Sequence, residues 1–108
     1  MNEWITKHSG DDNHMYYLIC YDIEDDQQRS RIARLLEGFG ERVQQSVFEC
    51  QLDPSGWRQL LRRLHQEFHP QGRDSIRIYP LCADCCRRAL GMGNIPPSPQ
   101  EGVAYIHI

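Results

Sequence analysis

The first clear feature of the chain is a run of apolar residues that begins at Met15. In MYYLICYDI, residues 15–23, almost every position up to Asp22 is apolar or aromatic. An apolar run without polar alternation predicts a strand covered on both faces, and hence a central strand of a sheet. Asp22 lies at the carboxyl end of this strand, where the buried run stops.

Two later segments have apolar residues at the spacing of amphipathic helices. The first begins at an acidic cap, Asp25 or Asp26, and its apolar stripe consists of Ile32, Leu35, Leu36 and Phe39. The second begins at Asp53-Pro54, an N-cap followed by proline at the first helical position. Its stripe consists of Trp57, Leu60, Leu61, Leu64 and Phe68. Each stripe predicts a helix that packs one side against a sheet.

Shorter strand patterns complete the chain. Residues 41–52 alternate toward their end, but Val43 and Val47 do not share that alternation. This mismatch predicts two short strands separated by a bulge or tight turn near Gln45. Residues 74–80 alternate as a further strand, and the chain finishes with a short apolar strand at Val103–Ile108.

The order of these elements predicts an α+β fold, the ferredoxin-like βαββαβ sandwich with an antiparallel sheet. Residues 15–95 form the domain, behind a flexible N-terminal leader at residues 1–14. Residues 96–108 form a loop and the additional C-terminal strand, which has no place in a four-stranded sheet. We expect this strand to pair with the sheet edge of a second copy in a homodimer.

The length and composition exclude several classes of protein. With 108 residues the chain allows one domain. No stretch approaches the ~18 consecutive apolar residues of a membrane-spanning helix, so no membrane partner is expected. Residues 27–90 contain eleven arginines against seven acidic residues, a balance of +4, whereas the rest of the chain has a balance of −7. This asymmetry suits a nucleic-acid backbone beside a metal, although a solvated surface explains it equally well.

The cysteines favour a cytoplasmic protein. There are five, an odd number, without a secretory signal. Cys82-x-x-Cys85 has the spacing of a zinc-binding pair of cysteines or of a redox-active pair. Zinc needs four ligands, which Cys86 and a distant histidine would have to complete, so reduced thiols are the favoured interpretation.

Four motifs in order resemble the CRISPR-associated protein two family, small adaptation proteins that act alongside the CRISPR integrase. They are MYYLICYDI, RSRIARLL, RVQQSVFEC and DSIRIYPLC, between Met15 and about Cys82. The resemblance implies ferredoxin-like homodimers with an exchanged C-terminal strand, acting as metal-dependent endonucleases on RNA or double-stranded DNA. Gln45 departs from the family, which commonly has an aromatic residue there. Family members usually begin near the strand, so Met1 and Met15 are both candidate starts.

The resemblance also implies the site residues. Asp22 matches the proposed Mg²⁺ ligand, with Mn²⁺ as a possible substitute, and Tyr21 precedes it in the catalytic motif. The positions that match the nucleic-acid-binding residues are Arg29, Arg31, Arg42, Ser46 and Phe48. Independently, one aspartate per chain is few for Mg²⁺ chemistry, and a two-fold dimer would supply a second. Phe48 also fits a position in the core.

Three functions remain open on the sequence. The first is a metal-dependent endonuclease centred on a dimeric pair of Asp22 carboxylates. The second is a catalytically idle dimer that bridges integrase subunits and binds duplex DNA through the same arginines. A more distant third is a toxin-type RNA interferase, since such proteins share the ferredoxin-like plan. The first two differ only in whether Asp22 is required.

Overall fold

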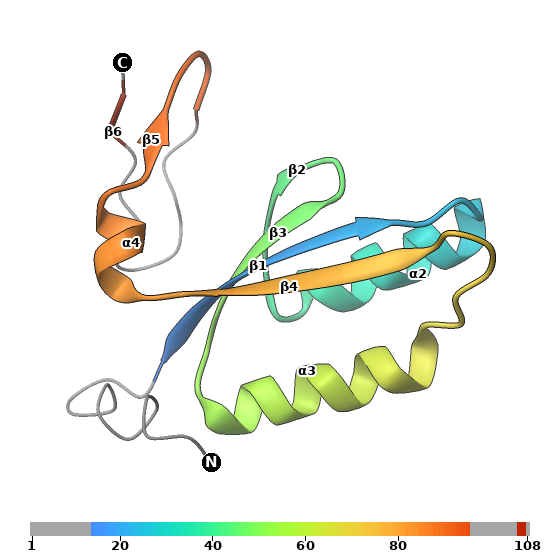
Figure 1. The fold of residues 1–108 in the computed structure, drawn as a ribbon. Coiled ribbons are helices and arrows are strands. Elements are labelled where there is room, and N and C mark those ends of the chain that lie inside the picture. Colours follow the sequence, from blue (N-terminus) through green and yellow to red (C-terminus); the bar gives the residue numbers. More distant parts are fainter. Residues whose placement is uncertain (1–13, 96–105, 108) are drawn as a thin grey trace.

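The computed structural model describes residues 14–95 and 106–107 of the chain. The first six elements follow in the order β, α, β, β, α, β, which confirms the predicted ferredoxin-like plan (Figure 1). The elements are β1 (Met15–Asp22), α2 (Asp26–Glu37), β2 (Gly40–Gln44), β3 (Val47–Leu52), α3 (Pro54–Glu67), β4 (Ser75–Leu81), α4 (Ala83–Arg87), β5 (Leu90–Gly91) and β6 (Ile106–His107).

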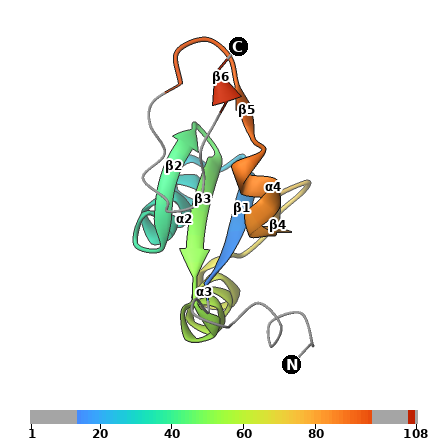
Figure 2. The same cartoon turned by 90° about the vertical axis from the view of Figure 1, so that its left-hand side faces the viewer.

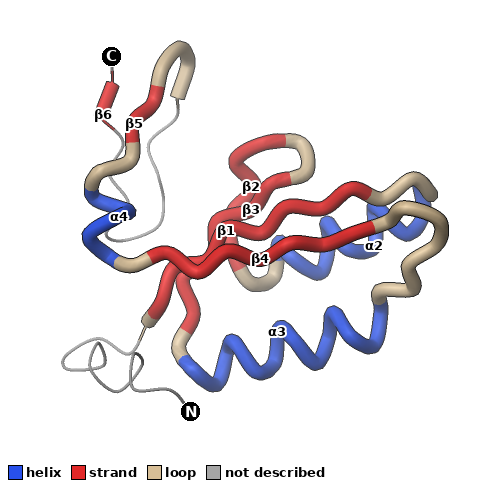
Figure 3. Tube along the Cα trace, viewed as in Figure 1, coloured by secondary structure: helices blue, strands red, loops and turns tan. Residues whose placement is uncertain are grey.

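Strands β1 to β4 form one antiparallel sheet in the order β2-β3-β1-β4, so β1 is a central strand as predicted. Helices α2 and α3 lie on the same side of this sheet (Figure 3). The pairing of β2 with β3 shifts register between Arg42 and Gln44, and a turn at Gln45 and Ser46 joins the two strands. The predicted irregularity near Gln45 is therefore confirmed.

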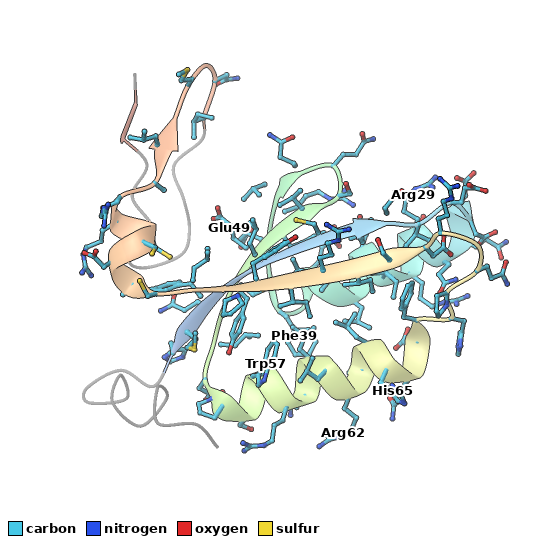
Figure 4. The ribbon with its side chains drawn as sticks, in the orientation of Figure 1. Arg29, Phe39, Glu49, Trp57, Arg62 and His65 are labelled. Atoms are coloured by element: carbon cyan, nitrogen blue, oxygen red, sulfur yellow. The ribbon has the colours of Figure 1, made fainter. Side chains whose placement is uncertain are left out.

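The core lies between the two helices and the sheet. The largest fully buried side chains are Phe48, Ile19, Ile32, Leu36, Leu60 and Cys50. The Trp57 indole of α3 stacks on the Tyr17 ring of β1, with centroids 4.3 Å apart and an angle of 4° between the planes. Figure 4 shows Trp57 and Phe39 between the sheet and α3. This burial of apolar surface docks α3 on the sheet.

In a single chain β1 is covered on both faces only near its beginning, where Tyr16 and Tyr17 are both buried. Tyr17, Ile19 and Tyr21 point into the core, but Leu18 and Cys20 on the opposite face are only half-buried. Directly across from them lie Tyr79 of β4 and Val47 of β3. We call Leu18, Cys20, Val47 and Tyr79 the open face of the sheet. An apolar run indicates that both faces of a strand are buried. It does not indicate whether the residues that bury them belong to the same chain or to a second one.

The C-terminal strand does not join the four-stranded sheet. Of the strand predicted at Val103–Ile108, residues 106–107 are described, and they pair in parallel with β5 of the same chain. Figure 2 shows β5 and β6 apart from the main sheet. Exchange of this strand with a second copy remains a prediction, and residues 1–13 of the predicted leader lie outside the described part. No helix in that part is long and apolar enough to cross a membrane.

Gly40 begins β2 at a point of close approach to β3. A Cβ here would meet the Glu49 carbonyl oxygen and lie 2.5 Å from the Cys50 sulfur. We expect Gly40→Ala to lower the free energy of unfolding by about 2–3 kcal/mol, because the added methyl group overpacks the sheet. Gly38→Ala is the matched control, since its Cβ would meet only the Leu35 carbonyl oxygen, at 3.3 Å. Urea unfolding at one protein concentration measures both, and equal midpoints would contradict the prediction.

Candidate functional site

A groove of about 430 Å³ lies at the carboxyl end of β1. It brings together residues from β1, α2 and the turn between β2 and β3. Its lining is Tyr21, Asp22, Ile23, Arg29, Ser30, Ala33, Arg42, Gln45 and Ser46. Five of the seven site residues expected from the sequence therefore line one groove, although 24 positions separate Asp22 from Ser46 in the chain.

The segment that follows Asp22 is held by hydrogen bonds from both sides. The Arg29 guanidinium donates to the carbonyl oxygens of Ile23 at 2.9 Å and Glu24 at 3.1 Å, and it also pairs with the Asp26 carboxylate. The Glu24 N–H donates to the Asp74 carboxylate at 3.1 Å. Figure 4 shows Arg29 at this end of the sheet. Arg29 therefore fixes the turn that presents Asp22, in addition to supplying positive charge.

Arg42 is held over the groove by two aromatic residues. Its guanidinium donates to the Tyr21 hydroxyl at 3.3 Å and lies 5.4 Å from the centre of the Phe48 ring, within cation–π distance. The Tyr21 hydroxyl donates in turn to the Gln45 carbonyl oxygen at 3.2 Å. Tyr21 is 5% exposed, so its contacts are those of a residue that positions Arg42.

Phe48 does not fit its expected place among the nucleic-acid-binding residues. Its side chain has no exposed surface, because it packs in the core on the helical side of the sheet. It contributes to the groove only indirectly, as the ring beneath Arg42. In the motif Phe48 comes two positions after Ser46, but Ser46 lies in the turn before β3, whereas Phe48 lies within the strand and packs into the core.

The Asp22 carboxylate is exposed, and it forms no hydrogen bond or ion pair with any residue of the described part. The guanidinium groups of two other groove residues donate elsewhere, Arg29 to the β1–α2 turn and Arg42 to Tyr21. Within the described residues no three His, Cys, Asp or Glu side chains gather into a metal-binding group. Asp22 thus offers one hard oxygen ligand, which fits Mg²⁺ only when further oxygen ligands come from water, phosphate or a second chain.

Arg31 lies away from this groove. It lines a second, shallower hollow of about 360 Å³ on α2, with Asp26, Gln27, Ser30 and Arg34. Two residues apart on a helix, Arg29 and Arg31 face different directions, as their spacing predicts. Ser30 lines both hollows. It was not among the expected site residues, and its helical position between the two arginines was the signal that could have identified it.

Gln45 was expected only as a departure from the family pattern. In the structure Gln45 lines the groove, and its backbone carbonyl oxygen accepts a hydrogen bond from the Tyr21 hydroxyl. A backbone carbonyl is present whatever the side chain, so the hydrogen bond to Tyr21 does not depend on the residue type. What the departure changes is the lining of the groove, which has an amide at this position.

Comparisons with known proteins identify the family of the chain. The family model of CRISPR associated protein Cas2 matches residues 15–89. The CRISPR-associated endoribonuclease Cas2 1 of Chloroflexus aurantiacus is 46% identical over 92 residues, which cover 85% of this chain and 99% of that protein. The crystal structure of Streptococcus pyogenes Cas2 matches with a TM-score of 0.64 and 33% identity, over 73% of this chain and 100% of that one.

One further solved structure comes from an assembly. A chain of a partial Cas6-RT-Cas1–Cas2 complex matches with a TM-score of 0.63 and 37% identity, over 71% of this chain and 89% of that chain. The family model spans more than half of the chain, and the Chloroflexus relative matches over nearly its whole length. As its four sequence motifs indicated, the chain belongs to the Cas2 family of CRISPR-associated proteins.

Proposed function

We propose that the chain is a metal-dependent endonuclease of CRISPR adaptation, which cleaves phosphodiester bonds of RNA or double-stranded DNA as a homodimer. The observation that carries the proposal is the groove that Asp22 lines together with Arg29, Arg42 and Ser46. The endoribonuclease name of the Chloroflexus relative supports the reaction class. Because the chain belongs to the Cas2 family, we do not retain the alternative function of a toxin-type RNA interferase.

Within this groove the residues divide by chemistry. Arg42 is exposed, and a guanidinium forks two N–H groups onto a phosphate. The Ser46 hydroxyl can donate to a further phosphate oxygen. Asp22 contributes a carboxylate and no bound partner competes for it among the described residues. Phosphate binding by the arginines and metal binding by Asp22 thus take place in one groove.

Asp22 is the proposed metal ligand. Mg²⁺ typically binds proteins through one or two carboxylates and completes its shell with water and substrate phosphate. When bound, Mg²⁺ or Mn²⁺ activates a water molecule and stabilises the negative charge of the scissile phosphate. Arg42 and Ser46 hold that phosphate in place, and Tyr21 holds Arg42.

A dimer through the open face would bring two copies of Asp22 together. Asp22 lies on the same side of β1 as Leu18 and Cys20, because side chains alternate along a strand. The four side chains of the open face are apolar and include Tyr79, which is 45% exposed, while Glu49 and Arg77 lie directly across from Leu18 and Cys20 on the same face. If two open faces pack about a two-fold axis, the apolar surface is buried and each Asp22 gains a second carboxylate. Strand exchange by the C-terminal segment would add to the same dimer.

We also propose that the dimer acts with the CRISPR integrase in the cytoplasm. Similarity to a chain of the Cas1–Cas2 assembly supports this partner, and five free cysteines suit a reducing compartment. The purified chain should be incubated with labelled RNA and duplex DNA in Mg²⁺, in Mn²⁺ and in chelator. Cleavage that requires a divalent ion supports the enzyme. If the chain binds nucleic acid but cleaves it under none of these conditions, the result would favour the alternative function, a non-catalytic scaffold that bridges integrase subunits.

Nucleic-acid binding should depend on Arg31 through its charge alone. We expect Arg31→Ala to reduce the slope of log K against log salt by about 1, because one phosphate contact is lost. Arg29→Ala should reduce the slope as well, and it should also loosen the turn that follows Asp22. Arg62→Ala on the outer side of α3 (Figure 4) is the matched control with the same change of charge. Binding isotherms between low and high salt measure the slopes, and an unchanged Arg31→Ala slope would remove this residue from the interface.

A further inference from the structure

The cysteine motif at the end of the sheet takes no part in the groove described above. Cys82 directly follows β4 and precedes α4, and Cys85 lies in the first turn of α4. Leu81 pairs with Tyr16 at the beginning of β1, whereas Asp22 is at its end. At about 3.3 Å per residue the two regions are separated by about 20 Å. The motif is therefore a separate feature of the molecule.

The two sulfur atoms face each other. They lie 3.1 Å apart, and the Cys85 N–H also donates to the Cys82 sulfur at 3.3 Å. Cys82 is half-buried and Cys85 is exposed, so a small molecule can reach the pair. A disulfide needs sulfur atoms about 2.05 Å apart, so closure requires an approach of only about 1 Å. The first turn of a helix supplies this proximity without any movement of the sheet.

The surroundings make the two thiols unequal. The side-chain hydrogen bond from Cys85, followed by its backbone N–H, lowers the pKa of Cys82. The same side-chain contact raises the pKa of Cys85. The neighbouring Cys86 is buried, which raises its pKa to about 11 and keeps it a protonated thiol. The attacking species in exchange is the thiolate, so Cys82 is the favoured nucleophile among the three.

We propose that Cys82 and Cys85 form a site of thiol–disulfide exchange whose substrate is a low-molecular-weight disulfide. The Cys82 thiolate attacks one sulfur of that disulfide, forms a mixed disulfide and releases one thiolate. Cys85 then loses its proton to solvent and attacks the Cys82 sulfur, which expels the second thiolate. Two protein thiols are oxidised to one disulfide, and one small disulfide is reduced to two thiols.

A metal site is the competing use of the pair. Among the described residues no third cysteine, histidine or carboxylate joins these sulfurs in a group able to hold a metal. Cys86, the nearest further cysteine in the sequence, is buried. The observed contacts therefore favour a bond between the two sulfurs. That bond would tie the end of β4 to the first turn of α4 and fix the direction in which the chain leaves the sheet.

Incubation of the reduced full chain with glutathione disulfide, followed by acid quenching and intact-mass analysis, tests the proposal. We expect the wild type to lose two hydrogens and retain no glutathione, with the bond mapped to Cys82 and Cys85. Cys85→Ser should stop at the mixed disulfide and retain one glutathione on Cys82. Cys82→Ser should react with glutathione disulfide at least about tenfold more slowly than the wild type, because it lacks the favoured thiolate. The double serine variant is the matched control and should retain no glutathione at this motif.

Several results would overturn the proposal. They are a wild type that retains glutathione as a stable adduct, a disulfide mapped to another cysteine, or equal rates for the two single variants. Stoichiometric Zn²⁺ retained by the wild type and lost by the double variant would also overturn it, since the pair would then be part of a metal site. Circular dichroism of each variant shows whether the fold is kept. None of these readouts depends on nuclease activity, so they remain separate from the test of the proposed endonuclease.

Discussion

The substitution Asp22→Asn is expected to lower metal-dependent cleavage by about 10³-fold or more, while the fold is kept. Asparagine has nearly the same shape as aspartate but carries no charge, so it is a poor ligand for Mg²⁺. The Asp22 side chain is exposed and forms no hydrogen bond or ion pair with the described residues, so its loss removes no stabilising contact. Cleavage of labelled RNA and duplex DNA under single-turnover conditions measures the change.

Glu24→Gln provides the matched control for Asp22→Asn. Glu24 is an exposed acidic residue two positions away, and its described contacts are made by backbone atoms, to Asp74 and Arg29. This control should cleave as the wild type does, and both variants should give the wild-type circular dichroism spectrum. Equal cleavage by Asp22→Asn and wild type would place the activity at other residues or in a contaminant. An unchanged dimer in that variant would also show that Asp22 is not needed for assembly.

Substitution of the open face is expected to have the second-largest effect. We expect Leu18→Lys to raise the dissociation constant of the dimer about 100-fold or more, because an ammonium group would enter an apolar interface. Glu49 lies directly across the sheet from residue 18, so the added ammonium stands opposite a carboxylate rather than a like charge in the folded monomer. Light scattering and sedimentation over a range of concentrations measure the dimer, and cleavage should fall with it.

Leu61→Lys is the matched control for the open face. Leu61 is 40% exposed on α3, on the helical side of the molecule, so the same change there leaves the open face intact. This variant should stay dimeric. If Leu18→Lys is folded and as dimeric as Leu61→Lys, the dimer uses another surface, and the proposed pairing of Asp22 across the open face is wrong.

Much of the fold follows from local patterns in the sequence. Asp25 and Asp53 cap α2 and α3 as expected, because each carboxylate accepts a hydrogen bond from the N–H three residues later. The mismatched alternation around Gln45 correctly indicated a break between β2 and β3. The two-residue pairing of β5 with β6 was not expected. A strand of two residues carries too little periodicity to be recognised.

The site was harder to predict than the fold. Motif spacing gathered Asp22, Arg29, Arg42 and Ser46, which do line one groove. It could not distinguish Phe48, which lies on the buried side of β3. Nor could it show that Arg29 holds carbonyl oxygens of its own chain, because backbone acceptors leave no trace in the sequence. Contacts of this kind appear only when helix α2 and the turn that precedes it are placed together.

The stack of Trp57 on Tyr17 gives this chain an internal optical probe. The sequence contains two tryptophans, Trp4 and Trp57, so Trp4→Phe leaves a single indole. The Trp57 indole lies stacked on the Tyr17 ring with centroids 4.3 Å apart, so its emission reports whether α3 is docked on β1. Separation of the helix from the sheet should shift this emission to the red and restore tyrosine fluorescence. Fluorescence in stopped flow can therefore time the docking of α3, independently of any nucleic acid or metal.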